Sequence, residues 1–326
     1  MISIFRDRSS ANVFWLIFFS VLLHAHFLVR PVEVPAFVEQ GFLGYFVQKY
    51  ISPLPSVAIT LLYQVIVLLQ ALRLNYILND VRMFQRQSFT PALSYVLLTA
   101  LLPEWNTLSP ALIANSFIIW LIYRLPKLYN TQSPKTLIYN MGIIAGIAVM
   151  AYYPSLPLIL VVYFSIAILR PLKPNEWFIL LMGILTPFYF WAAWLFINDR
   201  LPDIKAFIPR WQPHIIVVKN YVHAIITYSL LGICILGGLI TWQNNNGRML
   251  IQVRKVWAVL LIMLVLFIPM VFLVPNVSTE ALLLSIVPAA AILANLFLYP
   301  RSLVLPTIIF VLCIALVIYN NWDLGF

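Results

Sequence analysis

Continuous runs of apolar residues are the feature of this sequence that most restricts its fold. We count about eleven such runs, at residues 13–29, 56–77, 91–102, 110–123, 138–152, 156–169, 177–197, 221–241, 256–274, 281–299 and 302–319. In lipid, backbone N–H and C=O groups have no water to bind, so each run predicts a helix, and the absence of polar–apolar alternation excludes a β-barrel. The sequence therefore predicts an all-α, polytopic transmembrane helical bundle of about 11 membrane segments, forming a single domain over residues 1–326.

Composition supports this prediction and excludes several classes of protein. Of the 326 residues, 63% are hydrophobic and 9% are charged, and the mean hydropathy is +0.96. A soluble domain is nearer half apolar and one quarter charged, so the excess apolar surface requires lipid. The sequence has no Walker A motif, Rossmann glycine fingerprint, HExxH or CxxC motif, which argues against ATP-driven and zinc-hydrolytic enzymes. Both cysteines, Cys234 and Cys313, lie inside apolar runs, where packing is expected and a disulfide is not.

The charged residues predict the orientation of the bundle. If the N-terminus is cytoplasmic and every run crosses, 14 of the 20 Lys and Arg residues fall on the inner side. Most of the Asp and Glu residues fall on the outer side. Short basic loops are typical of the cytoplasmic face, so the net charge of +10 indicates membrane topology and not a nucleic-acid partner. The prediction is N-in and C-out.

Four of the runs are shorter than a bilayer is thick, and they form two pairs, at residues 91–123 and 138–169. The run between Pro91 and Pro103 covers about 18 Å at about 1.5 Å per residue, whereas the hydrocarbon core is about 30 Å thick. Each pair is either two short or tilted spans or a re-entrant hairpin buried in the bundle. Short paired helices tend to enclose a cavity, so we expect a concave region open to the outer face.

Two hydrophilic segments lie on the predicted outer side. Residues 30–55 follow the first run and end in an amphipathic piece, 41–51, whose apolar face can lie along the lipid surface as an interfacial helix. Residues 198–220 form the second outer loop. Neither segment is long enough to build a core alone, and chemistry is expected near the first.

Three outer carboxylates are candidate catalytic residues: Glu39, Glu33 and Glu104. A shielded carboxylate at a membrane surface can act as a general base or bind a metal ion. Glu39 is the better placed of the first two, because the amphipathic piece would hold it against the bundle. Glu104 lies in the turn of the first short pair, where an unpartnered acid is costly. The alternatives are a solvated loop acid for Glu33 and Glu39, and a helix-capping acid for Glu104.

Outward-facing cations are candidate ligand-binding residues. The second outer loop places Arg200, Arg210, His214 and Lys219 on the side where Lys and Arg are disfavoured, and an anionic phosphate or pyrophosphate headgroup would explain them. The alternative is a solvated interfacial loop. Tyr153 closes the second short pair on the outer side, where it offers either a hydroxyl group or a member of an aromatic belt.

The layout resembles the glycosyltransferase-C superfamily, polytopic enzymes that take a sugar from a polyprenyl-phosphate donor at the outer face. In that superfamily an outer loop with surface helices and a catalytic Asp or Glu follows the first span, and a second acid often lies between spans three and four. Glu33 or Glu39 matches the first position and Glu104 the second. The segment at residues 137–176 resembles the small-residue helix, Tyr-Pro break and following helix found there; its sequence is LIYNMGIIAGIAVMAYYPSLPLILVVYFSIAILRPLKPNE. The isolated Glu residues differ from the usual Asp of a local acidic motif. The whole chain also resembles a family of bacterial inner-membrane proteins without an assigned activity.

The resemblance implies a multi-pass protein of the bacterial inner (cytoplasmic) membrane that acts on polyprenyl-phosphate-linked sugar, or a catalytically silent relative. Glu39 or Glu33 would be the base, Glu104 a partner or metal ligand, and Arg210 and Lys219 would clamp the donor phosphate. A divalent cation is one option for a cofactor, which the sequence leaves unknown. The expected partners are membrane lipid and the lipid-linked sugar. Two alternatives stay open: a non-catalytic subunit with membrane protein partners, and a transporter or flippase of lipid-linked precursors.

Overall fold

A computed structural model of the chain describes residues 2–7, 9, 11–35, 41–171, 173–200, 221–247, 249–273, 278–300, 302 and 304–322, with only the backbone at 221–223 and 278. Within these residues the chain is helical and contains no strand. The α-helices are α1 (Ile2–Phe5), α2 (Ala11–Leu23), α3 (Phe42–Phe46), α4 (Ser56–Asp80), α5 (Thr90–Thr99), α6 (Pro110–Arg124), α7 (Lys135–Ala151), α8 (Pro157–Leu169), α9 (Pro174–Ile197), α10 (Tyr221–Asn246), α11 (Ile251–Phe267), α12 (Met270–Leu273), α13 (Ser278–Ala281), α14 (Leu283–Leu298) and α15 (Val304–Asn321).

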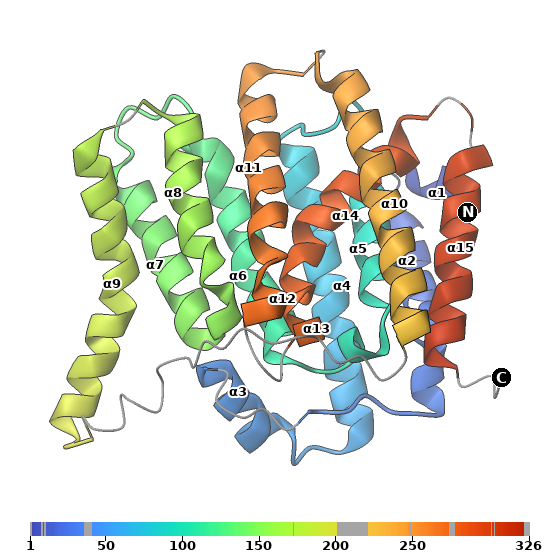
Figure 1. Ribbon diagram of the computed structural model, residues 1–326, viewed down its shortest axis with the longest axis horizontal. Coiled ribbons are helices and arrows are strands. Elements are labelled where there is room, and N and C mark those ends of the chain that lie inside the picture. The colour runs from blue at the N-terminus through green and yellow to red at the C-terminus, as the bar shows by residue number, and fades with distance from the viewer. Residues whose placement is uncertain are drawn as a thin grey trace.

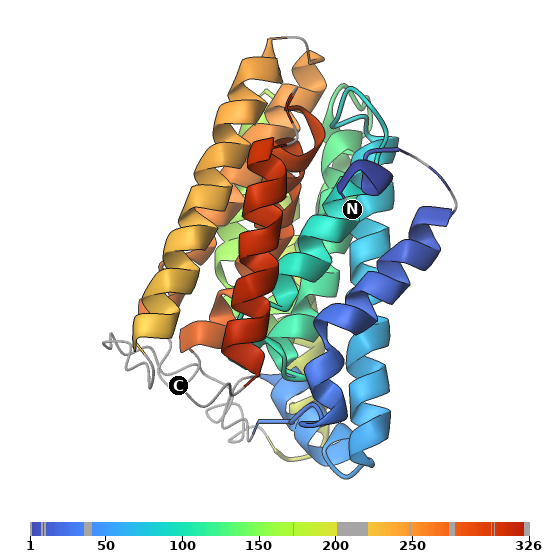
Figure 2. The same cartoon turned by 90° about the vertical axis from the view of Figure 1, so that its right-hand side faces the viewer.

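Six of these helices are long and apolar enough to cross a membrane. They cover Ser56–Asp80, Pro110–Leu128, Pro174–Ile197, Ala224–Asn246, Ile251–Leu273 and Val304–Asn321. Five shorter apolar helices accompany them, at Ala11–Leu23, Thr90–Thr99, Lys135–Ala151, Tyr153–Leu169 and Leu283–Leu298. The helices lie roughly parallel in a bundle whose connections gather at its two ends (Figures 1 and 2). The fold class is therefore confirmed as an all-α bundle with multi-pass character.

The two short pairs of the sequence prediction differ from one another in the structure. The apolar run expected to end at residue 123 continues through the turn η4 (Leu125–Leu128), so this segment reaches spanning length. Its partner α5 has 10 residues and stays short. In the second pair, α7 has 17 residues and α8 has 13. Pro103 and Ser109–Pro110 explain the tight turn of the first pair, because Ser109 Oγ accepts the Leu112 N–H and caps α6.

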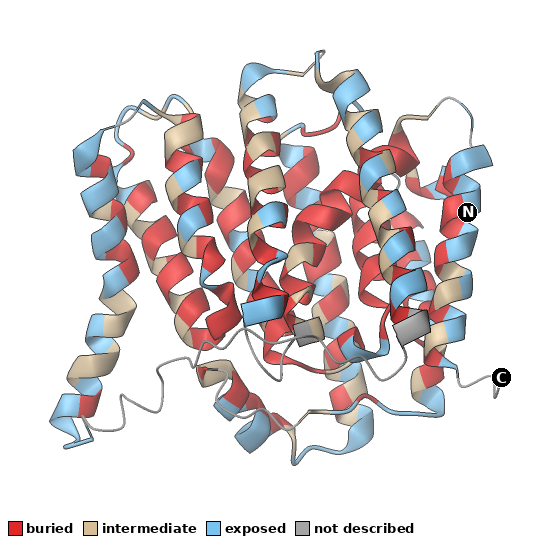
Figure 3. Cartoon of the chain, in the orientation of Figure 1, coloured by how far each residue is buried: buried red, intermediate tan, exposed pale blue. Residues whose placement is uncertain are grey.

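The core of the bundle is formed by two helices that do not reach its surface. Every residue of α5 is buried, and so is every residue of α14 except Ser285 (Figure 3). The two helices pack on each other, and α4, α6, α10 and α11 surround them. Most of α14 is apolar, and it includes four alanines, at 289, 290, 291 and 294. Helices that are apolar all round lie inside a bundle, which is where these two lie.

The outer helix α9 attaches to the bundle through glycines. It packs chiefly on α7 and lies at the edge of the molecule (Figure 1). A Cβ atom at Gly142, Gly146 or Gly183 would lie within 2.6 Å of a backbone carbonyl oxygen of the facing helix. These three positions therefore let the two backbones approach closely, as small residues do in membrane helix pairs.

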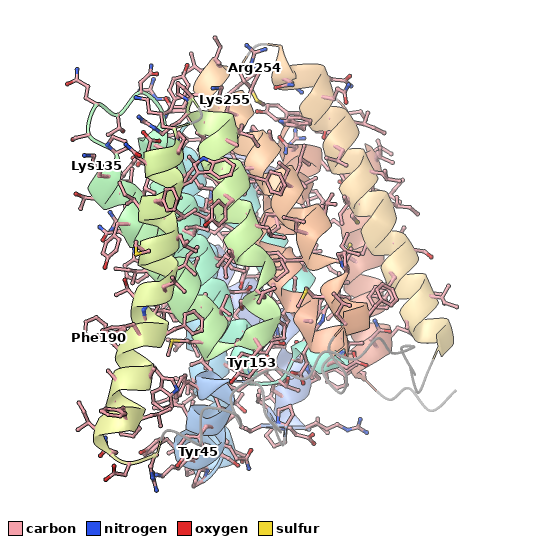
Figure 4. All side chains as sticks on the ribbon, turned by 60° about the vertical axis from the view of Figure 1, so that its left-hand side comes forward. Tyr45, Lys135, Tyr153, Phe190, Arg254 and Lys255 are labelled. Carbon is pink, nitrogen blue, oxygen red and sulfur yellow. The ribbon has the colours of Figure 1, made fainter. Side chains whose placement is uncertain are left out.

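One end of the bundle is basic and the other carries the amphipathic piece. Figure 4 shows Lys135, Arg254 and Lys255 at one end, and Tyr45 and Tyr153 toward the other. At the second end, α3 lies against α6 and α7, and η2 (Val47–Ile51) follows α3. Because Lys and Arg favour the cytoplasmic side, we call the first end the inner end and the second the outer end.

Candidate outer-face acid site

Three short segments meet at the outer end of the bundle. The turn η3 (Pro103–Trp105) joins α5 to α6, the turn η5 (Tyr153–Ser155) joins α7 to α8, and α13 precedes α14. The indole Nε1–H of Trp105, a fully buried side chain, donates to the carbonyl oxygen of Thr279 at 2.9 Å. This bond places the carboxylates at 104 and 280 on two neighbouring segments.

A buried amide network forms the floor beneath these segments. Asn106 Nδ2 donates to Asn321 Oδ1 at 2.7 Å, and Asn321 Nδ2 donates to the carbonyl oxygen of Ala100 at 3.0 Å. The Tyr63 hydroxyl lies 3.2 Å from both Asn106 Oδ1 and the Trp105 carbonyl oxygen. Buried polar groups that are paired in this way fix the position of the segments that contain them, so the outer turn between α5 and α6 is held against α4 and α15.

Glu280 is the most perturbed carboxylate of the described residues. Its Oε2 atom is buried and has no hydrogen-bond partner. Burial, and then the negative charge of Glu104, raise the pKa of Glu280 to about 7. Glu104 itself is exposed. The two acids thus sit in different environments: Glu104 faces water, whereas Glu280 is half-buried and exchanges a proton readily near neutral pH.

Two hydroxyl groups, one just before η5 and one in it, are buried without hydrogen-bond partners. One is the hydroxyl of Tyr152, the residue that ends α7, and the other is that of Ser155. Burial, and then the negative charge of Glu280, raise the pKa of Tyr152. We call Glu104, Glu280 and Tyr152 the outer acid cluster. Unpartnered buried polar atoms are uncommon in native structures and often mark functional positions.

Some of the predicted site residues lie near the outer acid cluster, one lies away from it, and others lie outside the described residues. Glu33 is exposed, and its carbonyl oxygen accepts the Leu108 N–H at 3.2 Å, so the loop runs beside the turn that contains Glu104. Tyr153 is buried, with 8% of its surface exposed, and adjoins the outer acid cluster through Tyr152. Arg200 follows the C-terminus of α9 at the edge of the bundle. The predictions for Glu39, Arg210, His214 and Lys219 lie outside the described residues.

The sequence prediction did not select Glu280. In sequence it stands directly before the apolar run at 281, which is the ordinary position of an acid in the first turn of a helix. Its burial comes from contacts between α13 and η3, which are far apart in the chain. Only the position of an acid at the boundary of an apolar run could have drawn attention to it.

Within the described part of the chain, no three His, Cys, Asp or Glu side chains are grouped so that they could hold a metal ion. The outer acid cluster supplies two carboxylates and a phenol. These groups can move a proton between a carboxylate and a hydroxyl group.

The fold and this site define a polytopic helical membrane protein with an acid cluster at its outer end. The chain belongs to a family of unknown function, DUF6427, whose sequence model matches residues 36–325. No curated protein and no solved structure matches the chain.

Proposed function

We propose that the chain is a glycosyltransferase-C-like enzyme that transfers sugar from a polyprenyl-phosphate donor at the outer face of the membrane. The proposal includes the finer topology, in which all eleven apolar helices cross, the N-terminus is inside and the C-terminus outside. It also includes the location in the bacterial inner membrane. The observation that supports it best is the outer acid cluster, which combines an exposed carboxylate with a half-buried one whose pKa is raised to about 7.

The environment of Glu280 suits a general base. A catalytic base works best when its pKa lies near the working pH, because it is then sufficiently ionised and still accepts a proton readily. Glu280 therefore takes the role that the sequence suggested for Glu39 or Glu33. Glu104 is its partner: the second negative charge keeps the pKa of Glu280 high, as in other paired carboxylates.

The proposed transfer step involves the acceptor, the sugar donor and the outer acid cluster. An acceptor hydroxyl oxygen forms a bond to the anomeric carbon of the sugar, and the bond from that carbon to the phosphate oxygen breaks. The polyprenyl phosphate leaves with the electron pair. The acceptor proton moves to the Glu280 carboxylate.

The test compares conservative variants of the outer carboxylates. The purified protein is reconstituted in liposomes with polyprenyl-phosphate sugars, and sugar transfer is measured. Glu280→Gln should lower the rate by about 10² to 10⁴, the usual contribution of a general base, and Glu104→Gln should lower it less. Glu33→Gln, an exposed carboxylate nearby, is the matched control and should leave transfer unchanged.

The pH profile gives an independent readout. Because the base must be deprotonated, the wild-type rate should rise with pH up to about 7 and level off above it. Unchanged transfer in both Glu280→Gln and Glu104→Gln would end the proposal. Headgroup flipping without turnover would instead indicate a transporter, and dispensable outer acids in a protein that co-purifies with envelope proteins would indicate a non-catalytic subunit.

A further inference from the structure

Three cations gather around one tyrosine ring at the inner end of α4 and α6. The ring centroid of Tyr123 lies 3.8 Å from Lys127 Nζ, 5.0 Å from Arg73 Cζ and 5.9 Å from Arg124 Cζ. No carboxylate of the described residues forms an ion pair with any of the three. The Nε atom of Arg124 is buried and has no hydrogen-bond partner. We call Arg73, Arg124 and Lys127 the inner cation cluster.

The segment that presents two of these cations is held in place by hydrogen bonds. Arg170 Nη1 donates to the carbonyl oxygens of Leu128 and Thr131 at 3.0 and 2.9 Å. The same guanidinium forms a buried ion pair with Glu176 at 3.0 Å. On the other side, Gln252 Nε2 donates to the Pro126 carbonyl oxygen at 2.9 Å. The turn η4 is therefore fixed before any ligand arrives, which lowers the entropic cost of binding.

A groove of about 340 Å³ between α4 and α6 begins at the inner cation cluster. It is lined by Leu69, Gln70, Arg73, Ser116, Ile119 and Trp120. The amide of Gln70 is already satisfied, because Nε2 bonds the Leu112 carbonyl oxygen and Ser116 Oγ and Oε1 accepts the Tyr95 hydroxyl. Leu69 and Trp120 face outward, with 63% and 45% of their surfaces exposed. The groove thus offers an apolar wall at one end and positive charge at the other.

We propose that this groove and the inner cation cluster bind one anionic phospholipid of the inner leaflet. The phosphate lies between the guanidinium groups of Arg73 and Arg124 and the ammonium of Lys127, and one acyl chain lies in the groove against Leu69 and Trp120. Basic sites between membrane helices on the cytoplasmic side recognise anionic headgroups through this charge complementarity. A free phosphate would occupy only the charged end of the site, so an anionic phospholipid is the occupant that fits both the charged and the apolar part.

The experiment measures lipid retained by the full chain in native mass spectrometry, with phosphatidylglycerol and phosphatidylcholine of the same acyl chains. The wild type should retain one phosphatidylglycerol in preference to phosphatidylcholine. Arg73→Gln with Arg124→Gln should weaken this retention roughly thirtyfold, because each cation near an anionic headgroup contributes on the order of a fivefold change. The matched control removes two cations elsewhere at the inner end, Arg254→Gln with Lys255→Gln, and should retain the lipid.

A second pair of variants tests the groove without changing charge. Leu69→Trp fills the groove and should lower retention, whereas Leu61→Trp, equally exposed two turns away on α4 at 62%, should not. Equal retention of the two lipids by the wild type would overturn the proposal. So would displacement of the lipid by millimolar inorganic phosphate, which would show a site for the free anion, or equal loss in the variants and their matched controls.

Discussion

At the scale of single residues, Glu280 should destabilise the folded protein at neutral pH. Its pKa is raised from 4.5 to about 7 by burial and by Glu104, so folding favours the protonated carboxyl. As the pH rises from about 4.5 to about 7, the unfolded chain gives up this proton first, and stability is lost over that interval. The shift corresponds to about 3 kcal/mol of the free energy of unfolding above pH 7.

Glu280→Gln should therefore be more stable than the wild type at pH 8, with a higher midpoint of thermal unfolding in detergent followed by tryptophan fluorescence. The two proteins should converge below about pH 4, where the wild-type carboxyl is protonated in both states. Glu33→Gln, an exposed control, should stay within about 0.5 kcal/mol of the wild type at both pH values. A Glu280→Gln protein that is less stable at pH 8 would contradict the burial of an unpartnered carboxylate.

Glu280 also shows what could not be predicted from the sequence. The sequence indicated several acids on the outer side, and Glu104 was selected because an unpartnered acid in a turn between apolar runs is costly. In the structure Glu104 is exposed, and its charge acts on Glu280, 176 positions further along the chain. No periodicity connects the two, since their proximity depends on the Trp105–Thr279 hydrogen bond between separate segments.

At the scale of elements, the attachment of α9 should depend on its glycine contacts with α7. A Cβ atom at Gly183 would lie 2.4 Å from the Tyr139 carbonyl oxygen and 3.2 Å from the Gly142 Cα. Backbone atoms cannot rotate out of the way, so the helices must separate. Gly183→Ala should lower the free energy of unfolding by about 1–3 kcal/mol, measured as a drop in the midpoint of thermal unfolding.

The matched control is Gly232 in α10, where an added Cβ meets nothing within 4 Å. Gly232→Ala should leave stability unchanged or raise it by up to about 1 kcal/mol, because alanine has the higher helix propensity. If both variants lose equal stability, the close approach of α7 and α9 is not what holds α9 to the bundle.

Helix positions were largely predictable, whereas their depth in the bundle was not. Apolar runs separated by Pro, Gly and charged residues gave the segments, because backbone groups in lipid must pair within a helix. The run at 110–123 was predicted too short, since η4 continues the helical path through Leu125–Pro126. The short run at 91–102 was correctly identified as unusual, but only packing shows that α5 is buried on all sides against α14. The glycines of α7, spaced four apart, were the one sequence signal of a close helix pair.

At the scale of the whole molecule, the topology can be tested by labelling single cysteines from one side of the membrane. Ser56 lies at the outer end, where α4 begins, and Ser133 lies at the inner end before α7. Both are exposed. The native Cys234 and Cys313 are buried, with 1% and 0% of their surfaces exposed, so they contribute little background. In right-side-out vesicles a membrane-impermeant maleimide should label Ser56→Cys at once, and Ser133→Cys only after permeabilisation.

A third position decides whether the first short pair crosses. Thr107 lies in the turn between α5 and α6, beside the Leu108 N–H that bonds the Glu33 carbonyl oxygen of the outer loop. If α5 and α6 both cross, this turn reaches water on the outer side, and Thr107→Cys should be labelled from outside like Ser56→Cys. A hairpin that enters and leaves from the inner side would leave the turn within the bilayer, unlabelled from either side. A hairpin does not change the side of the membrane on which Ser133 lies, so only labelling at Thr107 distinguishes a crossing pair from a hairpin. The outer acid cluster can reach an acceptor dissolved in water only if α5 and α6 both cross.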